Sequence, residues 1–179
     1  MAGDDDHRPP DLVAGDYRRR ALDPEERLQH ARDIAWQALG RRDRTVAELA
    51  RTLAAKRVEP AAIEVVVAEL CEQGYLDDAR YAHRFAEDRR RLDGWGAERI
   101  ERRLHALGVA PDHIAAAVAE QDAGSELDAA LALLRRRFPD PPATPRDLER
   151  ALGVLVRKGY ELELAHDALR RHAGAPALD

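Results

Sequence analysis

The strongest constraint in this sequence is a repeat, because one pattern of apolar residues, prolines and glycines returns at a constant offset of 51 residues. Six positions recur without a gap: Leu49, Leu53, Val58, Pro60, Ile63 and Val67 return as Ile100, Leu104, Val109, Pro111, Ile114 and Val118. A second step of the same length leads from Leu104, Gly108, Val109 and Val118 to Leu155, Gly159, Tyr160 and Leu169. The third copy is weaker, with Ala151 and Ala165 where the second has isoleucine. Repetition at this period is typical of tandem structural units that stack and share core.

Each copy contains the signals of three helices. The units span residues 25–75, 76–123 and 124–173, between a predicted disordered acidic tail (residues 1–24) and a short C-terminal tail (residues 174–179). Aromatic residues make up only 4% of the chain and charged residues 35%, a balance that favours helices over sheet. The sequence therefore predicts an all-α fold of three tandem three-helix, helix-turn-helix-like repeats.

Helix boundaries in the first unit are marked by capping residues. Asp23 precedes Pro24 and its following acids, and Thr45 with Glu48 forms a capping box. Pro60 opens a third helix that is expected to turn five side chains inward: Ile63, Val66, Val67, Leu70 and Cys71. In this interpretation Cys71 is a buried, inert thiol.

The middle unit carries the densest local signal, from Gly74 to Val109. Asp77 and Asp78 are good N-terminal caps, and Ala82 and Ala86 would allow a neighbouring helix to approach closely. Tyr81, Phe85 and Leu92 are predicted to share one helix face. Gly94 suits a left-handed C-terminal cap. Trp95, held between Gly94 and Gly96, is either a plug against the core or an anchor for a partner.

Several classes of function find no support in the sequence. There is no HExxH motif, no His/Cys cluster with metal-ligand spacing and no glycine-rich phosphate loop, so we expect neither catalysis nor a cofactor nor a metal. The formal net charge of −5 argues against strong independent DNA binding. A single cysteine, no membrane-length apolar run and an N-terminus unlike a signal peptide favour a cytoplasmic protein, which we expect to be a monomer.

Clusters of cationic residues are the main candidate for binding. They surround Trp95 and recur in the third unit: Arg89, Arg90, Arg91, Arg99, Arg102, Arg103, Arg135, Arg136, Arg137, Arg157 and Lys158. Arg99 and Arg103 lie one turn apart, off the Ile100/Leu104 face, and are expected to point together into solvent. One interpretation is a solvated helix surface balanced by neighbouring acids. The other is an electropositive stripe along the array, reaching either acidic protein or DNA phosphate.

The middle unit resembles the RecX family of regulatory proteins. The resemblance lies in Gly74-Tyr75-Leu76-Asp77-Asp78-x-Arg80-Tyr81-Ala82, then Gly94-Trp95-Gly96 and a Leu-x-x-x-Gly-Val ending. It implies three tandem repeats in an elongated, curved array without catalytic residues, whose glycines, Tyr75, Asp77, Asp78, Arg80 and Tyr81 are structural. It further implies a protein that binds the RecA filament on DNA and inhibits its ATPase, strand-exchange and co-protease activities, in DNA repair, recombination and the SOS response.

Two other functions fit a chain of three-helix units. One is a helix-turn-helix transcriptional regulator, although the third helices carry acids such as Glu64, Glu69, Asp112 and Glu120 where a recognition helix needs cations. The other is an interaction scaffold unrelated to RecA. Weak contact with single- or double-stranded DNA is compatible with the RecA-binding interpretation.

Overall fold

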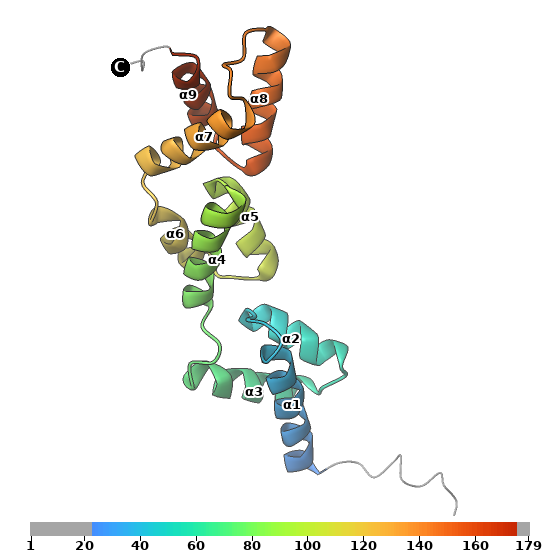
Figure 1. The fold of residues 1–179 in the computed structure, drawn as a ribbon. Helices are drawn as coiled ribbons and strands as arrows, with labels where there is room; N and C mark the ends of the chain where they lie inside the picture. Colours follow the sequence, from blue (N-terminus) through green and yellow to red (C-terminus); the bar gives the residue numbers. More distant parts are fainter. Residues whose placement is uncertain (1–22, 175–179) are drawn as a thin grey trace, which may run out of the picture.

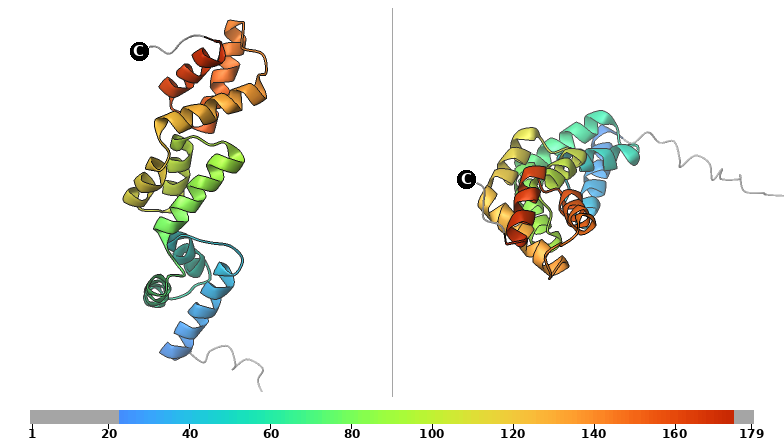
Figure 2. Two further views of the ribbon diagram at one scale, coloured as in Figure 1. Left: turned by 60° about the vertical axis from the view of Figure 1, so that its left-hand side comes forward. Right: turned by 90° about the horizontal axis from the view of Figure 1, so that it is seen from above.

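The computed structural model describes residues 23–174, which form nine α-helices and no strand (Figure 1). The helices are α1 (Pro24–Leu39), α2 (Val46–Ala55), α3 (Pro60–Glu72), α4 (Asp78–Asp93), α5 (Ala97–Leu107), α6 (Pro111–Ala119), α7 (Ala123–Arg137), α8 (Pro145–Lys158) and α9 (Leu162–His172). They stack in threes along one axis, and a turned view shows the same elongated, curved array (Figure 2). The predicted all-α repeat fold is confirmed. Of the two predicted tails, residues 1–22 and 175–179 lie outside the described residues, while Asp23, Pro24 and Gly174 are described, with α1 beginning at Pro24.

Three separate hydrophobic clusters form the core, one for each set of three helices. Leu49, Ile100 and Ala151 occupy equivalent places and are all fully buried, as are Leu53, Leu104 and Leu155. The 51-residue offset therefore marks the second helix of each unit by its core positions. Ala151, although smaller than Leu49 and Ile100, faces the core in the same way.

The predicted caps account for the helix ends. Asp23 and Thr45 each complete a capping box with the glutamate three residues later. Asp77 accepts a hydrogen bond from the Arg80 N–H, and Gly94 ends α4 with φ +59°. These caps satisfy backbone groups that have no partner within the helix.

Two predicted core positions are wrong. The buried stripe of α3 follows Ala62, Val66 and Leu70, so Cys71 lies about a quarter-turn away and is exposed. In α4 the buried stripe is Ala82 and Ala86, which pack against α6. Tyr81 and Phe85 lie at the rim of this core. Leu92 lies on the same side of α4 as Tyr81 and Phe85 but close to the end of the helix, and it is 68% exposed.

The second helices of the three units meet end to end. At the first joint, the C-terminal turn of α5 abuts the N-terminus of α2, and the Thr45 hydroxyl donates to the Leu107 carbonyl at 2.7 Å. The Asp78 carboxylate at the start of α4 accepts from the Val46 N–H at 2.9 Å. A carbonyl-bearing helix end and a carboxylate thus both face an N-terminus whose N–H groups carry positive partial charge.

The second joint repeats this arrangement with backbone atoms. The N–H groups of Gly96 and Glu98, at the start of α5, donate to the Lys158 and Gly159 carbonyls at the end of α8, at 2.9 and 3.1 Å. The Glu126 carboxylate of α7 accepts from the Ala97 N–H at 2.8 Å. α2, α5 and α8 therefore form a column along the array (Figure 1). Within residues 23–174, no helix is both long and apolar enough to cross a membrane.

Candidate anion-binding groove

A groove lies at the second joint, between the helix set α4–α6 and the set α7–α9. It consists of two hollows of about 690 and 350 Å³ that share Arg99 and Arg157. We call this surface the joint groove; its lining residues are Trp95, Arg99, Arg102, Arg103, Leu133, Arg136, Arg137, Val154, Arg157 and Lys158. Cations from three segments that are separate in the sequence, on α5, α7 and α8, thus meet at one place.

The joint groove is strongly cationic. Its lining contains six arginines and one lysine, and none of the described Asp or Glu side chains lines it. None of these seven cations forms an ion pair with another residue of the described range 23–174. Other arginines do pair, for example Arg32 with Glu69 at 2.9 Å and Arg171 with Asp167 at 3.1 Å. The groove is therefore a local concentration of uncompensated positive charge in a chain of net charge −5.

Arg99 is held in place by the joint. Its guanidinium stacks on Trp95, with Cζ 4.2 Å from the ring centroid, and its Nη1 donates to the Arg157 carbonyl at 2.8 Å. Trp95 in turn meets the Phe85 ring edge to face, with the centroids 6.2 Å apart. Arg99 and Arg103 line the same open hollow, but they differ in surroundings, because Arg99 is half-buried and hydrogen-bonded whereas Arg103 is exposed. Trp95 both contacts the core and lines the groove.

The other cations of the groove divide into anchored and free side chains. Lys158 donates from Nζ to the Asp93 carbonyl at 2.6 Å, and Arg102 from Nε to the Glu98 carbonyl at 3.2 Å. Arg103, Arg136 and Arg137 are exposed. An anionic partner would therefore meet exposed guanidinium groups on both sides of the hydrogen-bonded Arg99.

Four predicted binding residues lie outside the joint groove. Arg90 donates to the Ala117 and Val118 carbonyls at the end of α6, and burial lowers the pKa of its guanidinium. Arg91 pairs with Asp88 at 3.2 Å, and Arg135 is exposed. Arg89 pairs with Asp93, and its Cζ lies 5.6 Å from the centroid of the Trp95 ring. The run 89–91 thus places three arginines in three different environments.

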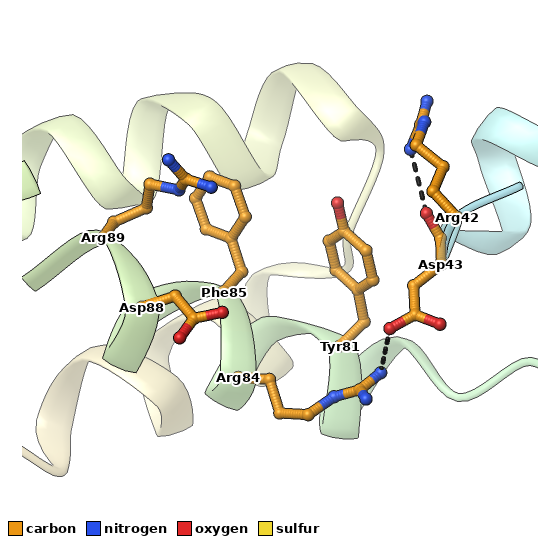
Figure 3. Close-up of a pocket in the computed structure, with 7 residues that line it drawn as sticks. All are labelled: Arg42, Asp43, Tyr81, Arg84, Phe85, Asp88 and Arg89. Carbon is orange, nitrogen blue, oxygen red and sulfur yellow. Dashed lines mark hydrogen bonds and ion pairs between the residues drawn. The ribbon is translucent and has the colours of Figure 1, made fainter. Parts of the chain in front are cut away.

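A smaller hollow of about 260 Å³ lies near the first joint (Figure 3). The Tyr81 and Phe85 rings of α4 line it, with their centroids 6.1 Å apart, and Arg42 and Asp43 from the α1–α2 turn lie at the Tyr81 end. Its charges are compensated, since Arg84 reaches the Asp43 carboxylate at 2.6 Å and Arg42 reaches Glu48 at 2.8 Å. The hydrogen bond from Arg42 lowers the pKa of Glu48. Sequence reasoning missed this hollow, because only the fold brings the turn to α4.

The motif residues of the middle unit form turns, helix caps and side-chain contacts within the fold. Gly74 has φ +74°, and its carbonyl accepts from Arg80 at 2.8 Å. Tyr75 is exposed at the edge of the Trp36 ring, with the centroids 4.6 Å apart. Gly96 is the N-terminal cap of α5, against the end of α8. Among residues 23–174, no group of three or more His, Cys, Asp or Glu side chains could hold a metal ion.

Comparison with known proteins places this architecture in a family. A family model described as "RecX, first three-helix domain" matches residues 31–70, and "RecX, second three-helix domain" matches residues 77–118. A curated relative from Leptothrix cholodnii, "Regulatory protein RecX", is 35% identical over 74% of this chain and 82% of its own length. The chain belongs to the RecX family of regulatory proteins. RecX relatives from Trichlorobacter lovleyi and Amycolatopsis mediterranei are 37% and 31% identical, over 69% and 83% of this chain and 82% and 86% of their own lengths.

Solved RecX structures have the same fold. "Crystal structure of RecX from Lactobacillus salivarius" superposes with a TM-score of 0.74 at 15% identity, over 83% of this chain and 97% of that one. "Crystal structure of regulatory protein RecX" gives 0.68 at 19% identity, over 79% and 71% of the two chains. At these identities the likeness concerns the fold, and the residues of the joint groove are argued from this chain alone.

Proposed function

We propose that this RecX family protein binds the RecA filament on DNA and inhibits its ATPase, strand-exchange and co-protease activities. It acts in the cytoplasm as a monomer, through binding and without chemistry of its own. Family membership supports a regulatory role, and the elongated array supports a partner that is itself long. Several modest contacts along one array add up when the partner repeats.

The observation that carries the proposal is the set of seven cations in the joint groove that form no ion pair with any residue of the range 23–174. Like charges gathered at one place repel one another, and an anionic partner relieves this repulsion. A filament of RecA on DNA offers two kinds of anion, the carboxylates of the protein and the phosphates of the nucleic acid. Contacts of either kind weaken with salt, because screening acts over about 10 Å at 0.1 M.

The helix-turn-helix regulator remains the competing function. Such a protein reads DNA with an exposed cationic third helix in the major groove. Here the third helix of the middle unit, α6, begins with Pro111-Asp112-His113 and reaches its C-terminal cap at Glu120. The cations lie instead at the joint, on α5, α7 and α8. This placement favours the RecA-binding interpretation.

The test is RecA's DNA-dependent ATP hydrolysis, measured with and without the purified protein. We expect substoichiometric to equimolar protein to slow hydrolysis, and to bind RecA-coated DNA more tightly than bare DNA at two salt concentrations. Unchanged hydrolysis together with equal retention on coated and bare DNA would contradict the proposal. Sequence-selective binding to duplex DNA without RecA would favour the transcriptional regulator.

A further inference from the structure

The two joints share a feature at the residue that follows each second helix. Gly108 and Gly159 end α5 and α8 with φ +86° and +88°, and each lies against the second helix of the preceding unit. A Cβ added to Gly108 would lie 2.4 Å from the Ala47 Cβ. A Cβ added to Gly159 would lie 2.3 Å from the Arg99 Cβ and 2.5 Å from its backbone N. Real side chains do not approach this closely, so any larger residue forces the two helices apart.

The third equivalent position shows that a left-handed backbone alone does not require glycine, although the larger φ values of Gly108 and Gly159 add strain to the close contact. Arg57 follows α2 at the same place in the repeat and has φ +62°. It is exposed, because α2 belongs to the first helix set and, among residues 23–174, no further helix set precedes it. A left-handed residue with a long side chain is therefore tolerated at this exposed helix end, and glycine occupies both positions where another helix of the described range packs closely.

We propose that Gly108 and Gly159 are positioning residues, whose missing side chains set the angle between successive units and, at Gly159, assemble the joint groove. The groove depends on the second joint because its cations come from both sides. α5 contributes Arg99, Arg102 and Arg103, whereas Arg136, Arg137, Arg157 and Lys158 come from beyond the joint. The hydrophobic clusters on the two sides of the joint share no residue.

The consequence for binding follows from geometry. Displacing α8 from α5 breaks the backbone hydrogen bonds from Gly96 and Glu98 and the bond from Arg99 to the Arg157 carbonyl. The two cationic sets then separate while each keeps its charge. A polyanion that needs both sets at once loses affinity, because the second set no longer acts at high effective concentration. The extension of this argument to RecA rests on the function proposed above.

The first joint permits a rescue experiment. The added Cβ in Gly108→Ala meets only the Ala47 Cβ at close range, since the Ala47 Cα is 3.9 Å away. Small-angle X-ray scattering should therefore show a changed array shape for Gly108→Ala. The double variant Ala47→Gly/Gly108→Ala should return toward the wild-type profile. A single variant with the wild-type profile, or a double variant as altered as the single, would overturn the inference at this joint.

The second joint offers a matched control. Gly94→Ala introduces the same kind of left-handed alanine, at φ +59°, but its Cβ meets nothing within 4 Å. Gly159→Ala should change the scattering profile and elute from heparin, used as a simple polyanion, at clearly lower salt than both wild type and Gly94→Ala. Circular dichroism should show wild-type helix content in all three proteins. If Gly159→Ala does not fold, the rescue pair at the first joint decides the inference.

Two outcomes separate this inference from the proposed function. If wild-type protein does not bind RecA filaments, the function fails, while scattering and heparin elution still test the joints. If Gly159→Ala keeps the wild-type scattering profile and heparin elution, Gly159 is not a positioning residue, whatever the protein does to RecA. If Gly159→Ala loses heparin binding and inhibition of RecA together, the result supports both the positioning role of Gly159 and the proposed function.

Discussion

The Thr45 hydroxyl donates a hydrogen bond to the Leu107 carbonyl across the first joint, although the two residues lie 62 positions apart in the sequence. Thr45 is also the N-terminal cap of α2, since its Oγ1 accepts from the Glu48 N–H at 3.1 Å. One fully buried hydroxyl therefore caps the N-terminus of α2 and also bonds α2 to the last turn of α5 in the next unit.

Replacing this hydroxyl should be costly. Thr45→Ala removes the cap and leaves the Leu107 carbonyl without its short hydrogen bond, so the free energy of unfolding should fall by about 1–3 kcal/mol. Thr45→Ser keeps the hydroxyl and should lose less than half of that. Urea denaturation followed by circular dichroism measures both. Equal losses in the two variants would show that the methyl group matters, not the hydrogen bonds.

Replacing a core leucine should lower the free energy of unfolding far more than replacing an exposed leucine. Leu104 is fully buried at the centre of the middle cluster, so Leu104→Ala should lower the free energy of unfolding by about 2–5 kcal/mol. Leu92→Ala is the matched control, because Leu92 is exposed, and it should change stability by less than about 0.5 kcal/mol. A small effect of Leu104→Ala in the same denaturation assay would contradict the core assignment.

The Asp78 carboxylate should make stability depend on pH. Burial raises the pKa of Asp78, and the hydrogen bond from the Val46 N–H opposes this effect only in part. The folded state therefore binds a proton more tightly than the unfolded state, so this group's contribution to stability falls as pH rises through the interval from its ordinary pKa to the raised one. Asp78→Asn keeps an oxygen acceptor but removes the charge.

Relative to Asp78→Asn, wild-type protein should accordingly lose stability as pH rises above about 4, the ordinary pKa of an aspartate. Denaturation at several pH values measures the difference, and NMR titration of the carboxyl measures the pKa directly. A difference that stays constant with pH, or that grows in favour of wild type, would show that the carboxyl is not destabilised by burial.

The exposed arginines that α5 contributes to the joint groove should matter for binding and not for folding. Arg102 and Arg103 are exposed and have no ion pair among residues 23–174. Arg102→Glu/Arg103→Glu should shift the free energy of unfolding by no more than about 1 kcal/mol per residue while abolishing inhibition of RecA. Parallel loss of bare-DNA binding would indicate phosphate as the contact, and retained DNA binding would indicate RecA. Full inhibition by this variant would support a merely solvated helix surface.

The repeat was predictable because core positions require apolar residues, and these recur in the sequence at a constant spacing. Leu49 and Ile100 recur at one offset for the single reason that both face the same kind of core. Helical periodicity does not tell which of two adjacent apolar residues faces inward, which is why Cys71 was misplaced beside Leu70. The capping motifs were readable because their partners lie within three residues.

The site was predictable only in part. The arginine clusters are visible in the sequence, but which members meet depends on the docking of α8 onto α5. The sequence alone does not distinguish Arg90, which donates a hydrogen bond to the end of α6, from Arg91, which forms an ion pair with Asp88. Nor does it show that Glu126 reaches the Ala97 N–H, because that bond joins two units.

If the joint groove contacts the RecA filament, reversing charges in the groove should weaken binding more than reversing charges elsewhere. Equilibrium binding of labelled protein to RecA-coated single-stranded DNA measures this, with Arg136→Glu/Arg137→Glu compared with Arg41→Glu/Arg146→Glu. Both pairs change the net charge equally, and the control pair is exposed and lies outside the groove. The groove variant should bind at least about tenfold more weakly, a loss of about 1.4 kcal/mol, with the control close to wild type. Equal affinities of the two variants would contradict the claim.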